Sequence, residues 1–115
     1  MSLKIYHNPR CSKSRQTLAI IESAGAEVEM VLYLQDPLSE EDIKDLLGKL
    51  GFSSARELMR RGEAIYKDLN LKEEDDETAL IAAMAAHPRL IERPIVVKGQ
   101  QALLGRPPEN AKKFL

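Results

Sequence analysis

The chain of 115 residues contains a single cysteine and no long hydrophobic run, and each scarcity excludes a class of protein. Because Cys11 has no partner, an internal disulfide scaffold and a four-ligand zinc site of the Cys-rich type are excluded. The longest apolar run, Ala79 to Ala86, is far shorter than the roughly 20 residues of a membrane-spanning helix. No signal-peptide core is present near the N-terminus, so we expect a cytoplasmic protein in a reducing compartment.

What is present is typical of one soluble globular domain. Apolar residues make up 43% of the chain and charged residues 30%, which argues against disorder. The length fits one domain with a core of its own. No internal repeat, linker or low-complexity stretch divides the sequence, and we therefore expect a single domain over residues 1–115.

The net charge of −1 conceals an uneven distribution. Residues 1–21 hold four bases and no acid, residues 22–77 hold 16 acids against 7 bases, and residues 87–108 are basic again. If the two basic ends meet in space, they form a local anion-attracting site on a nearly neutral protein. The alternative is a scatter of lysine and arginine over the surface. We expect neither nucleic acid nor a membrane as a partner.

Alternating apolar residues and turn signals predict the strands. We expect strands at residues 4–6, 28–34, 95–97 and 102–104. The strand over 28–34 should be polar at its start and buried further on. Gly99 suits the turn position that needs a positive φ between the last two strands.

Capping residues and apolar repeats predict the helices. Ser39 is a candidate N-cap for a helix that Gly51 ends, and Ser54 with Glu57 forms a possible capping box. We expect helices at residues 12–24, 40–50, 54–61 and 78–86, a helical turn near 65–71, a solvated helix start at 73–77, and a final helix ending at 115. The element order is β-α-β, a helical block, then β-β-α.

Cys11 lies in the loop between the first strand and the first helix. The unpaired N–H groups and the dipole of a helix start favour a thiolate and also bind oxyanions. The flanking bases Arg10, Lys13 and Arg15 add positive charge, and we expect His7 to be either a neighbour of the thiolate or a packing residue. The pKa of Cys11 should therefore be lowered, which makes it a candidate nucleophile.

Spacing tests other readings of this cysteine. A phosphatase-type anion loop needs arginine six residues after the cysteine, but that position is Thr17. A dithiol redox motif needs a second cysteine where Ser14 stands, so Cys11 has no resolving partner in the chain. His7 and His87 have no metal-ligand spacing with Cys11, and we predict no metal site.

The sequence resembles the glutaredoxin-linked arsenate reductase family, and it is similar to the short, arsenate reductase-like members. The resemblance covers essentially the whole chain and depends on the order and spacing of six segments together. These segments are residues 6–9, 11–15, 32–34, 55–60, 93–97 and 105–107. The resemblance implies a thioredoxin-like α/β fold, with a mixed sheet of about four strands and a helical insertion between strands two and three.

The resemblance also implies roles for individual residues. Three arginines, Arg60, Arg93 and Arg106, match the positions that surround the family's cysteine. Ser14 and Arg15 match the family's anion loop, and Asn8 matches its cysteine-side turn. Pro94 matches the family's cis-proline, which faces the cysteine. The implied reaction is reduction of arsenate to arsenite at Cys11, with glutathione as co-substrate, glutaredoxin as partner and no bound cofactor.

Two other functions fit the same residues. A thioredoxin-fold thiol oxidoreductase would act on glutathionylated or other thiol substrates, and its arginines would bind the carboxylates of glutathione. A non-enzymatic, transcription-regulator-like binding module is the second alternative. Relatives of that kind carry a cysteine pair, which this chain lacks, and need no arginine cluster.

Overall fold

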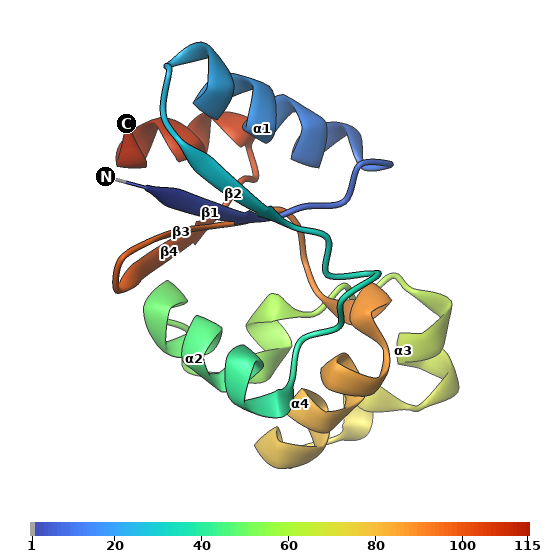
Figure 1. Cartoon of the computed structure of the whole chain (residues 1–115). Helices are drawn as coiled ribbons and strands as arrows, with labels where there is room; N and C mark the ends of the chain where they lie inside the picture. The colour runs from blue at the N-terminus through green and yellow to red at the C-terminus, as the bar shows by residue number, and fades with distance from the viewer. Residues whose placement is uncertain (1) are drawn as a thin grey trace. The chain divides into compact units, whose positions relative to one another are not determined.

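The structure is a computed structural model that describes residues 2–115, and the chain forms two compact units (Figure 1). The first unit contains both ends of the chain, up to Asp36 and again from Arg93 onward. The second unit is the continuous segment Pro37–Glu92. The chain therefore crosses between the units at residues 36–37 and 92–93, and a single domain over residues 1–115 stays a prediction.

The first unit is built on the mixed four-stranded sheet that the resemblance implied. The strands are β1 (Leu3–Tyr6), β2 (Val28–Val31), β3 (Ile95–Lys98) and β4 (Gln101–Leu104). Their order across the sheet is β2-β1-β3-β4, with β2 parallel to β1 and the other two pairings antiparallel. Gly99 has a φ of +61° in the two-residue loop between β3 and β4, as predicted.

Two helices, α1 (Ser12–Ser23) and the 3₁₀ helix η4 (Pro108–Phe114), lie side by side on one face of this sheet (Figure 1). Ile21 of α1 and Ala111 of η4 join Ile5 and Val96 of the sheet in one core cluster, and all four are fully buried. Burial of these apolar side chains holds the helices on the sheet. The start of α1, where Cys11 lies, is fixed by the same packing.

Strand β2 is shorter than predicted, since the alternating pattern covers residues 28–34 but the strand ends at Val31. β2 is an edge strand whose one partner, β1, ends at Tyr6 opposite Val31. The carbonyl of Leu32 then accepts the N–H groups of residues 35 and 36 in a turn. The predicted burial is correct for Tyr33, which is 2% exposed, and wrong for Met30 and Leu34, which are 52% and 41% exposed.

The second unit contains the predicted helical insertion between β2 and β3. Its elements are α2 (Glu40–Leu50), η1 (Ala55–Leu58), α3 (Ala64–Asp68), η2 (Leu71–Glu73), α4 (Glu77–Ala86) and η3 (Pro88–Leu90). The cap of α2 is confirmed, since the Ser39 hydroxyl accepts the Asp42 N–H at 3.1 Å and the Asp42 carboxylate accepts the Ser39 N–H at 3.1 Å. Ser54 and Glu57 form the predicted capping box of η1.

The predicted helix over 54–61 was too long, and the reason is a pairing of distant backbone. η1 ends at Leu58, and Met59 continues as extended chain that pairs with Ile91. The Arg60 N–H donates to the Leu90 carbonyl at 2.7 Å, so these backbone groups are not available to a helix. The solvated start predicted at 73–77 also differs, since α4 is capped only at Asp76.

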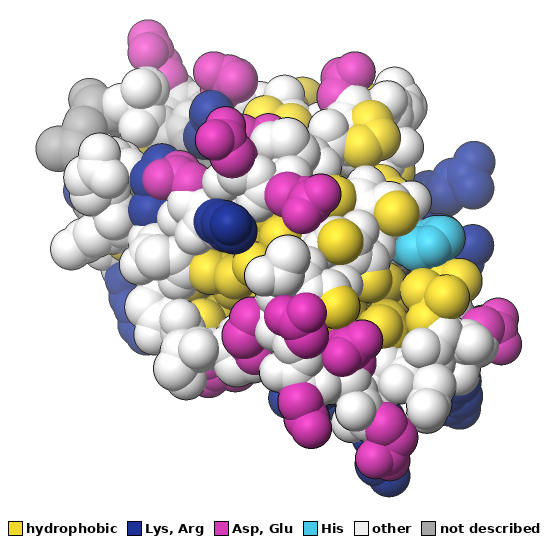
Figure 2. All heavy atoms as spheres, turned by 90° about the horizontal axis from the view of Figure 1, so that it is seen from below, with side chains coloured by type: hydrophobic (Ala, Val, Ile, Leu, Met, Phe, Trp, Pro, Cys, Tyr) yellow, Lys and Arg dark blue, Asp and Glu magenta, His cyan; other side chains and the backbone are white. Residues whose placement is uncertain are grey.

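The acidic middle of the sequence gives this insertion an acidic surface. The face of the molecule in Figure 2 carries many Asp and Glu side chains around an area of hydrophobic ones. Within residues 2–115, no helix combines the length and the apolar character that crossing a membrane requires.

Gly105 is the point in the first unit where three segments meet. A Cβ atom at this position would lie 2.5 Å from Thr17 Oγ1, 2.7 Å from Pro94 Cγ and 2.9 Å from Thr17 Cγ2. The Gly105 N–H donates to the Pro94 carbonyl at 2.9 Å. The Thr17 side chain is itself fully buried, and its hydroxyl donates to the Lys13 carbonyl at 2.8 Å. No side chain can therefore be added here without moving α1 or the segment that precedes β3.

We expect Gly105→Ala to lower the free energy of unfolding by about 1–3 kcal/mol, because the added methyl group overpacks a tight contact. The matched control is Gly48→Ala in α2, where a Cβ would meet nothing within 4 Å. That change should be neutral or stabilising by up to about 1 kcal/mol. Chemical denaturation of both variants measures the difference, and equal stabilities would contradict the contact.

Candidate active site around Cys11

Cys11 is the N-cap residue of α1, in the place that the sequence predicted for it. Its carbonyl accepts the Arg15 N–H at 3.0 Å, which is the first bond of the helix. The loop before it is closed by Asn8, whose side-chain oxygen accepts the Arg10 N–H at 3.0 Å and whose carbonyl accepts the Cys11 N–H at 3.0 Å. Cys11 retains 8% of its exposed surface. Asn8 thus closes the turn that leads into Cys11, and its role in the family's site stays a prediction.

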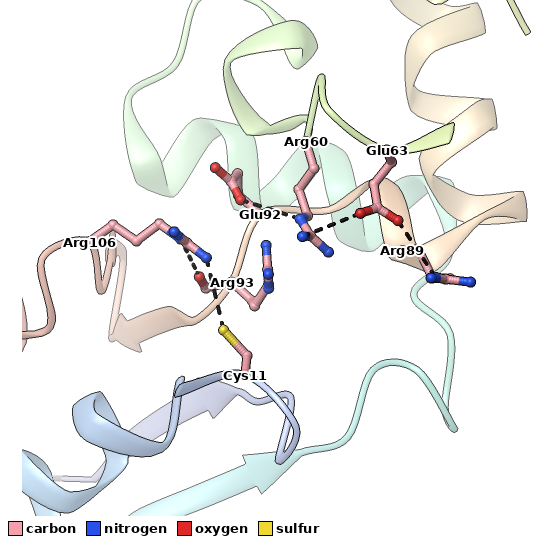
Figure 3. A network of polar contacts seen from close by, with 7 residues as sticks. All are labelled: Cys11, Arg60, Glu63, Arg89, Glu92, Arg93 and Arg106. Atoms are coloured by element: carbon pink, nitrogen blue, oxygen red, sulfur yellow. Dashed lines mark hydrogen bonds and ion pairs between the residues drawn. The ribbon is translucent and has the colours of Figure 1, made fainter. Parts of the chain in front are cut away.

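Two of the predicted arginines lie beside this thiol in the first unit (Figure 3). The Nη2 atom of Arg106 is 3.9 Å from Cys11 Sγ, and its Nε atom donates to the Arg93 carbonyl at 2.8 Å. One guanidinium therefore connects the cysteine to the chain just before β3. The Arg93–Pro94 and Arg106–Pro107 peptide bonds are both cis.

The pKa of Cys11 is the net result of opposed effects. Burial raises the pKa of the thiol, but the backbone N–H of Ser14, the charge of Arg93, the backbone N–H of Lys13 and the charge of Arg106 together outweigh it. The pKa of Cys11 is therefore below its ordinary value. A larger thiolate fraction near neutral pH makes Cys11 a better nucleophile.

The charges that lower the pKa of Cys11 are those of Arg93 and Arg106, which the family resemblance supplied, and not those of the flanking bases Arg10, Lys13 and Arg15. Arg15 is exposed, and its Nη1 atom donates to the Pro9 carbonyl at 2.9 Å, which braces the loop. Burial lowers the pKa of His7; the nearby charge of Glu22 raises it and that of Arg15 lowers it, leaving it below its ordinary value. His7 is thus neutral near neutral pH. Both arginines whose charges lower the pKa of Cys11 lie more than 80 residues after it in the sequence.

The side chain of Ser14 faces the interior of the loop. It is fully buried, its Oγ lies 2.7 Å from His7 Nδ1, and it accepts the Asn8 N–H at 3.0 Å. When neutral His7 carries its proton on Nε2, its Nδ1 atom accepts the hydroxyl proton of Ser14. Toward Cys11, Ser14 presents its backbone N–H. Substrate binding by Ser14 and Arg15 stays a prediction.

Arg60 belongs to the second unit, where it is held by two acids (Figure 3). Its Nη2 atom lies 3.3 Å from Glu63 Oε2, and its Nε atom lies 3.9 Å from Glu92 Oε1. Glu63 also pairs with Arg89, at 3.6 Å. The cluster contains two bases and two acids, so its charges balance. A contribution of Arg60 at Cys11 stays a prediction from the family resemblance.

The sequence reasoning gave no positioning role to Thr17 or to Gly105, although Gly105 lies in one of the six segments that carry the resemblance. Thr17 entered only as the residue that excludes a phosphatase loop. The signal that could have found it is helical spacing, because residues 14, 17 and 21 form the buried face of α1. Gly105 directly precedes Arg106, and its close contact could not be read from a single sequence. Among residues 2–115, no group of three or more metal-ligating side chains is gathered.

Comparison with known proteins agrees with this geometry. The model of the ArsC family matches residues 6–114. The chain belongs to the ArsC family.

Its relatives cover nearly its whole length. An arsenate reductase of Neisseria meningitidis is 46% identical over 114 residues, which are 98% of this chain and 97% of that protein. An uncharacterized protein of Escherichia coli, YfgD, is 56% identical over 98% of this chain and 96% of its own. The structure of an arsenate reductase from Vibrio cholerae superposes with a TM-score of 0.97, at 50% identity over 100% of this chain and 98% of that one. The predicted thioredoxin-like α/β fold and short-member family are thereby confirmed.

We expect Arg106→Ala to raise the pKa of Cys11, because it removes a charge 3.9 Å from the sulfur. In the wild type, alkylation by iodoacetamide should persist well below the ordinary cysteine pKa of about 8.5 and be lost as the pH falls through the lowered pKa. The midpoint should move upward in Arg106→Ala. The pH profile of the alkylation rate measures it.

Arg10→Ala is the matched control, since it removes an equal charge next to Cys11 in sequence. Its midpoint should stay close to that of the wild type, and an equal shift in both variants would contradict the assignment.

The lowered pKa of Cys11 also makes the stability of the fold depend on pH. The thiolate stabilises the fold fully above the unfolded-state pKa of about 8.5, and this contribution is lost as the pH falls through the folded-state pKa.

Proposed function

We propose that the protein reduces arsenate to arsenite through a covalent adduct on Cys11, with glutathione and glutaredoxin as the source of electrons. The observation that carries the proposal is the Arg106 guanidinium 3.9 Å from a helix-capping thiol whose pKa is lowered. This arrangement combines a nucleophile with an anion-binding group. The arsenate reductases of Neisseria meningitidis and Vibrio cholerae, at 46% and 50% identity, support arsenate as the substrate.

In the first step, the Cys11 thiolate attacks arsenic. A sulfur–arsenic bond forms, and one arsenate oxygen leaves as water after protonation. Backbone N–H groups at the start of α1 and the charges of Arg93 and Arg106 stabilise the oxyanion while its charge shifts. A guanidinium suits this role because its planar fork bonds two oxygens of a tetrahedral anion at once.

An external thiol completes the cycle, because the chain has no second cysteine. Glutathione thiolate attacks Cys11 sulfur, the electrons of the sulfur–arsenic bond pass to arsenic, and arsenite leaves as As(III). Cys11 remains as a disulfide with glutathione. A glutaredoxin thiolate then attacks the glutathione sulfur and releases the Cys11 thiolate. Ser14 stands at the position of a resolving cysteine, and its buried hydroxyl cannot replace one.

Replacing Arg93 or Arg106 by alanine should lower kcat/KM for arsenate by roughly 10- to 100-fold, since each loses charge-assisted hydrogen bonds worth about 1.5–3 kcal/mol. Arg60→Ala should do the same if the family role holds. Lysine variants are the matched controls and should recover activity only in part, because lysine keeps the charge without the fork. Steady-state arsenite formation measures the effect, and unchanged rates in all three alanine variants would remove the oxyanion role.

Cys11→Ser should form no arsenite. In the wild type with glutaredoxin withheld, a glutathione adduct should accumulate on Cys11, because nothing resolves the mixed disulfide. Intact-mass measurement detects this adduct, and dithiothreitol should reverse it. Steady turnover with thioredoxin alone and no adduct would contradict the mechanism. Reduction of a glutathionylated substrate without any arsenite formation would favour the thiol oxidoreductase instead.

A further inference from the structure

The second unit contains a cavity of about 470 Å³ that has no part in the chemistry at Cys11. Its lining consists of Arg56, Arg61, Tyr66, Lys67, Asn70 and Lys72. Four of these six side chains are cationic, and no acid lines the cavity. Its volume lies within the range of about 300–1,000 Å³ that is typical of small-molecule sites.

This concentration of positive charge runs against the composition of the unit. Residues 37–92 hold 13 acids and 8 bases, so half of the bases surround one cavity inside an acidic segment. A random scatter of surface lysine and arginine would place acids among them. The residues that line the cavity therefore have a net positive charge, whereas the unit as a whole has a net negative one.

Arg56 is the half-buried centre of this cluster, and it is bonded to neutral oxygen atoms. Its Nη1 atom donates to the Tyr66 hydroxyl at 2.9 Å and to the Leu71 carbonyl at 2.7 Å, and its Nη2 atom donates to the Glu74 carbonyl. These bonds fix the guanidinium, and Arg56 forms no ion pair with a carboxylate in the described chain. A half-buried charge without a counter-ion is costly, and a bound anion would offset that cost.

The other three cations, Arg61, Lys67 and Lys72, are exposed side chains that form no ion pair in the described chain. The ion pairs within residues 2–115 involve Lys49, Arg60 and Arg89, and none includes a cation of the cavity. The pKa of Glu57 is lowered chiefly by the backbone N–H of Ser54 and only lastly by the charge of Arg61. The acid that senses Arg61 is thus already engaged elsewhere.

We propose that this cavity binds a small molecule carrying two or more phosphate groups. Guanidinium and ammonium groups together are typical of phosphate sites, where arginine supplies a fork and lysine a point charge. Four cations around one cavity match the several charges of a linked pair of phosphates better than the charge of a single small anion. The proposal is independent of the function proposed for Cys11, because it uses other residues and another class of ligand.

Inorganic pyrophosphate is the probe, and isothermal titration calorimetry on the full chain is the measurement. The wild type should bind it saturably at one site, with an affinity that falls as salt is added. The double variant Lys67→Gln with Lys72→Gln should bind about tenfold more weakly or worse, because two charge-assisted contacts are lost. Lys44→Gln with Lys49→Gln is the matched control, which removes two charges from α2 in the same unit and should change the affinity less than about twofold.

Three results would overturn the proposal. Absence of saturable binding by the wild type excludes the site, and equal weakening in the two double variants shows attraction to net charge alone. Citrate tests the ligand class, since equal or tighter binding of this polycarboxylate would remove the preference for phosphate. Both double variants should unfold at the wild-type midpoint in a thermal scan. Unchanged arsenite formation by the cavity variant would separate this site from Cys11.

Discussion

The absence of a side chain at Gly105 is the constraint on which the site in the first unit depends. Thr17 lies about one and a half turns into α1, whose N-cap is Cys11, and Pro94 directly follows Arg93. Gly105, which directly precedes Arg106, touches both. The contact at Gly105 thus brings together the three segments that carry Cys11, Arg93 and Arg106. A larger residue at this position would push these segments apart. The packing of α1 and η4 on the sheet maintains it.

The chemistry at Cys11 follows from this arrangement through electrostatics. Burial alone would raise the pKa of the thiol and make it unreactive. The backbone donors at the start of α1 and the two arginines reverse that effect. Neutral His7 and inward-facing Ser14 shape the loop without adding charge at the sulfur. The same donors that stabilise a thiolate are suited to an incoming oxyanion, so activation of the nucleophile and recognition of the substrate share one set of groups.

Local signals were enough to predict much of the fold and the position of the nucleophile. Ser39, Ser54 and Gly99 determine caps and a turn within a few residues of themselves, and the structure confirms each. The length of β2 was mispredicted because it depends on where its neighbour β1 ends. The helix after Ser54 was overextended because backbone near residue 91 competes for the same groups. Both errors concern partners that are distant in sequence.

The arginines illustrate the same limit at the site. Arg106 is 95 residues from Cys11 in the chain, and charge counting showed only that both ends of the sequence are basic. The family resemblance supplied the individual residues, whereas position in the sequence favoured the flanking bases, whose charges are not among those that lower the pKa of Cys11. The close contact at Gly105 leaves no pattern in one sequence, whereas the burial of Thr17 could have been read from the helical spacing of residues 14, 17 and 21.

The most direct test of the account is a crystal structure after soaking with arsenate, with anomalous diffraction data recorded at the arsenic absorption edge. We expect an arsenic peak at bonding distance from Cys11 Sγ, with arsenate oxygens within hydrogen-bond reach of Arg93 and Arg106. Arsenic bound elsewhere, or a Cys11 sulfur that remains unmodified at saturating arsenate, would contradict it.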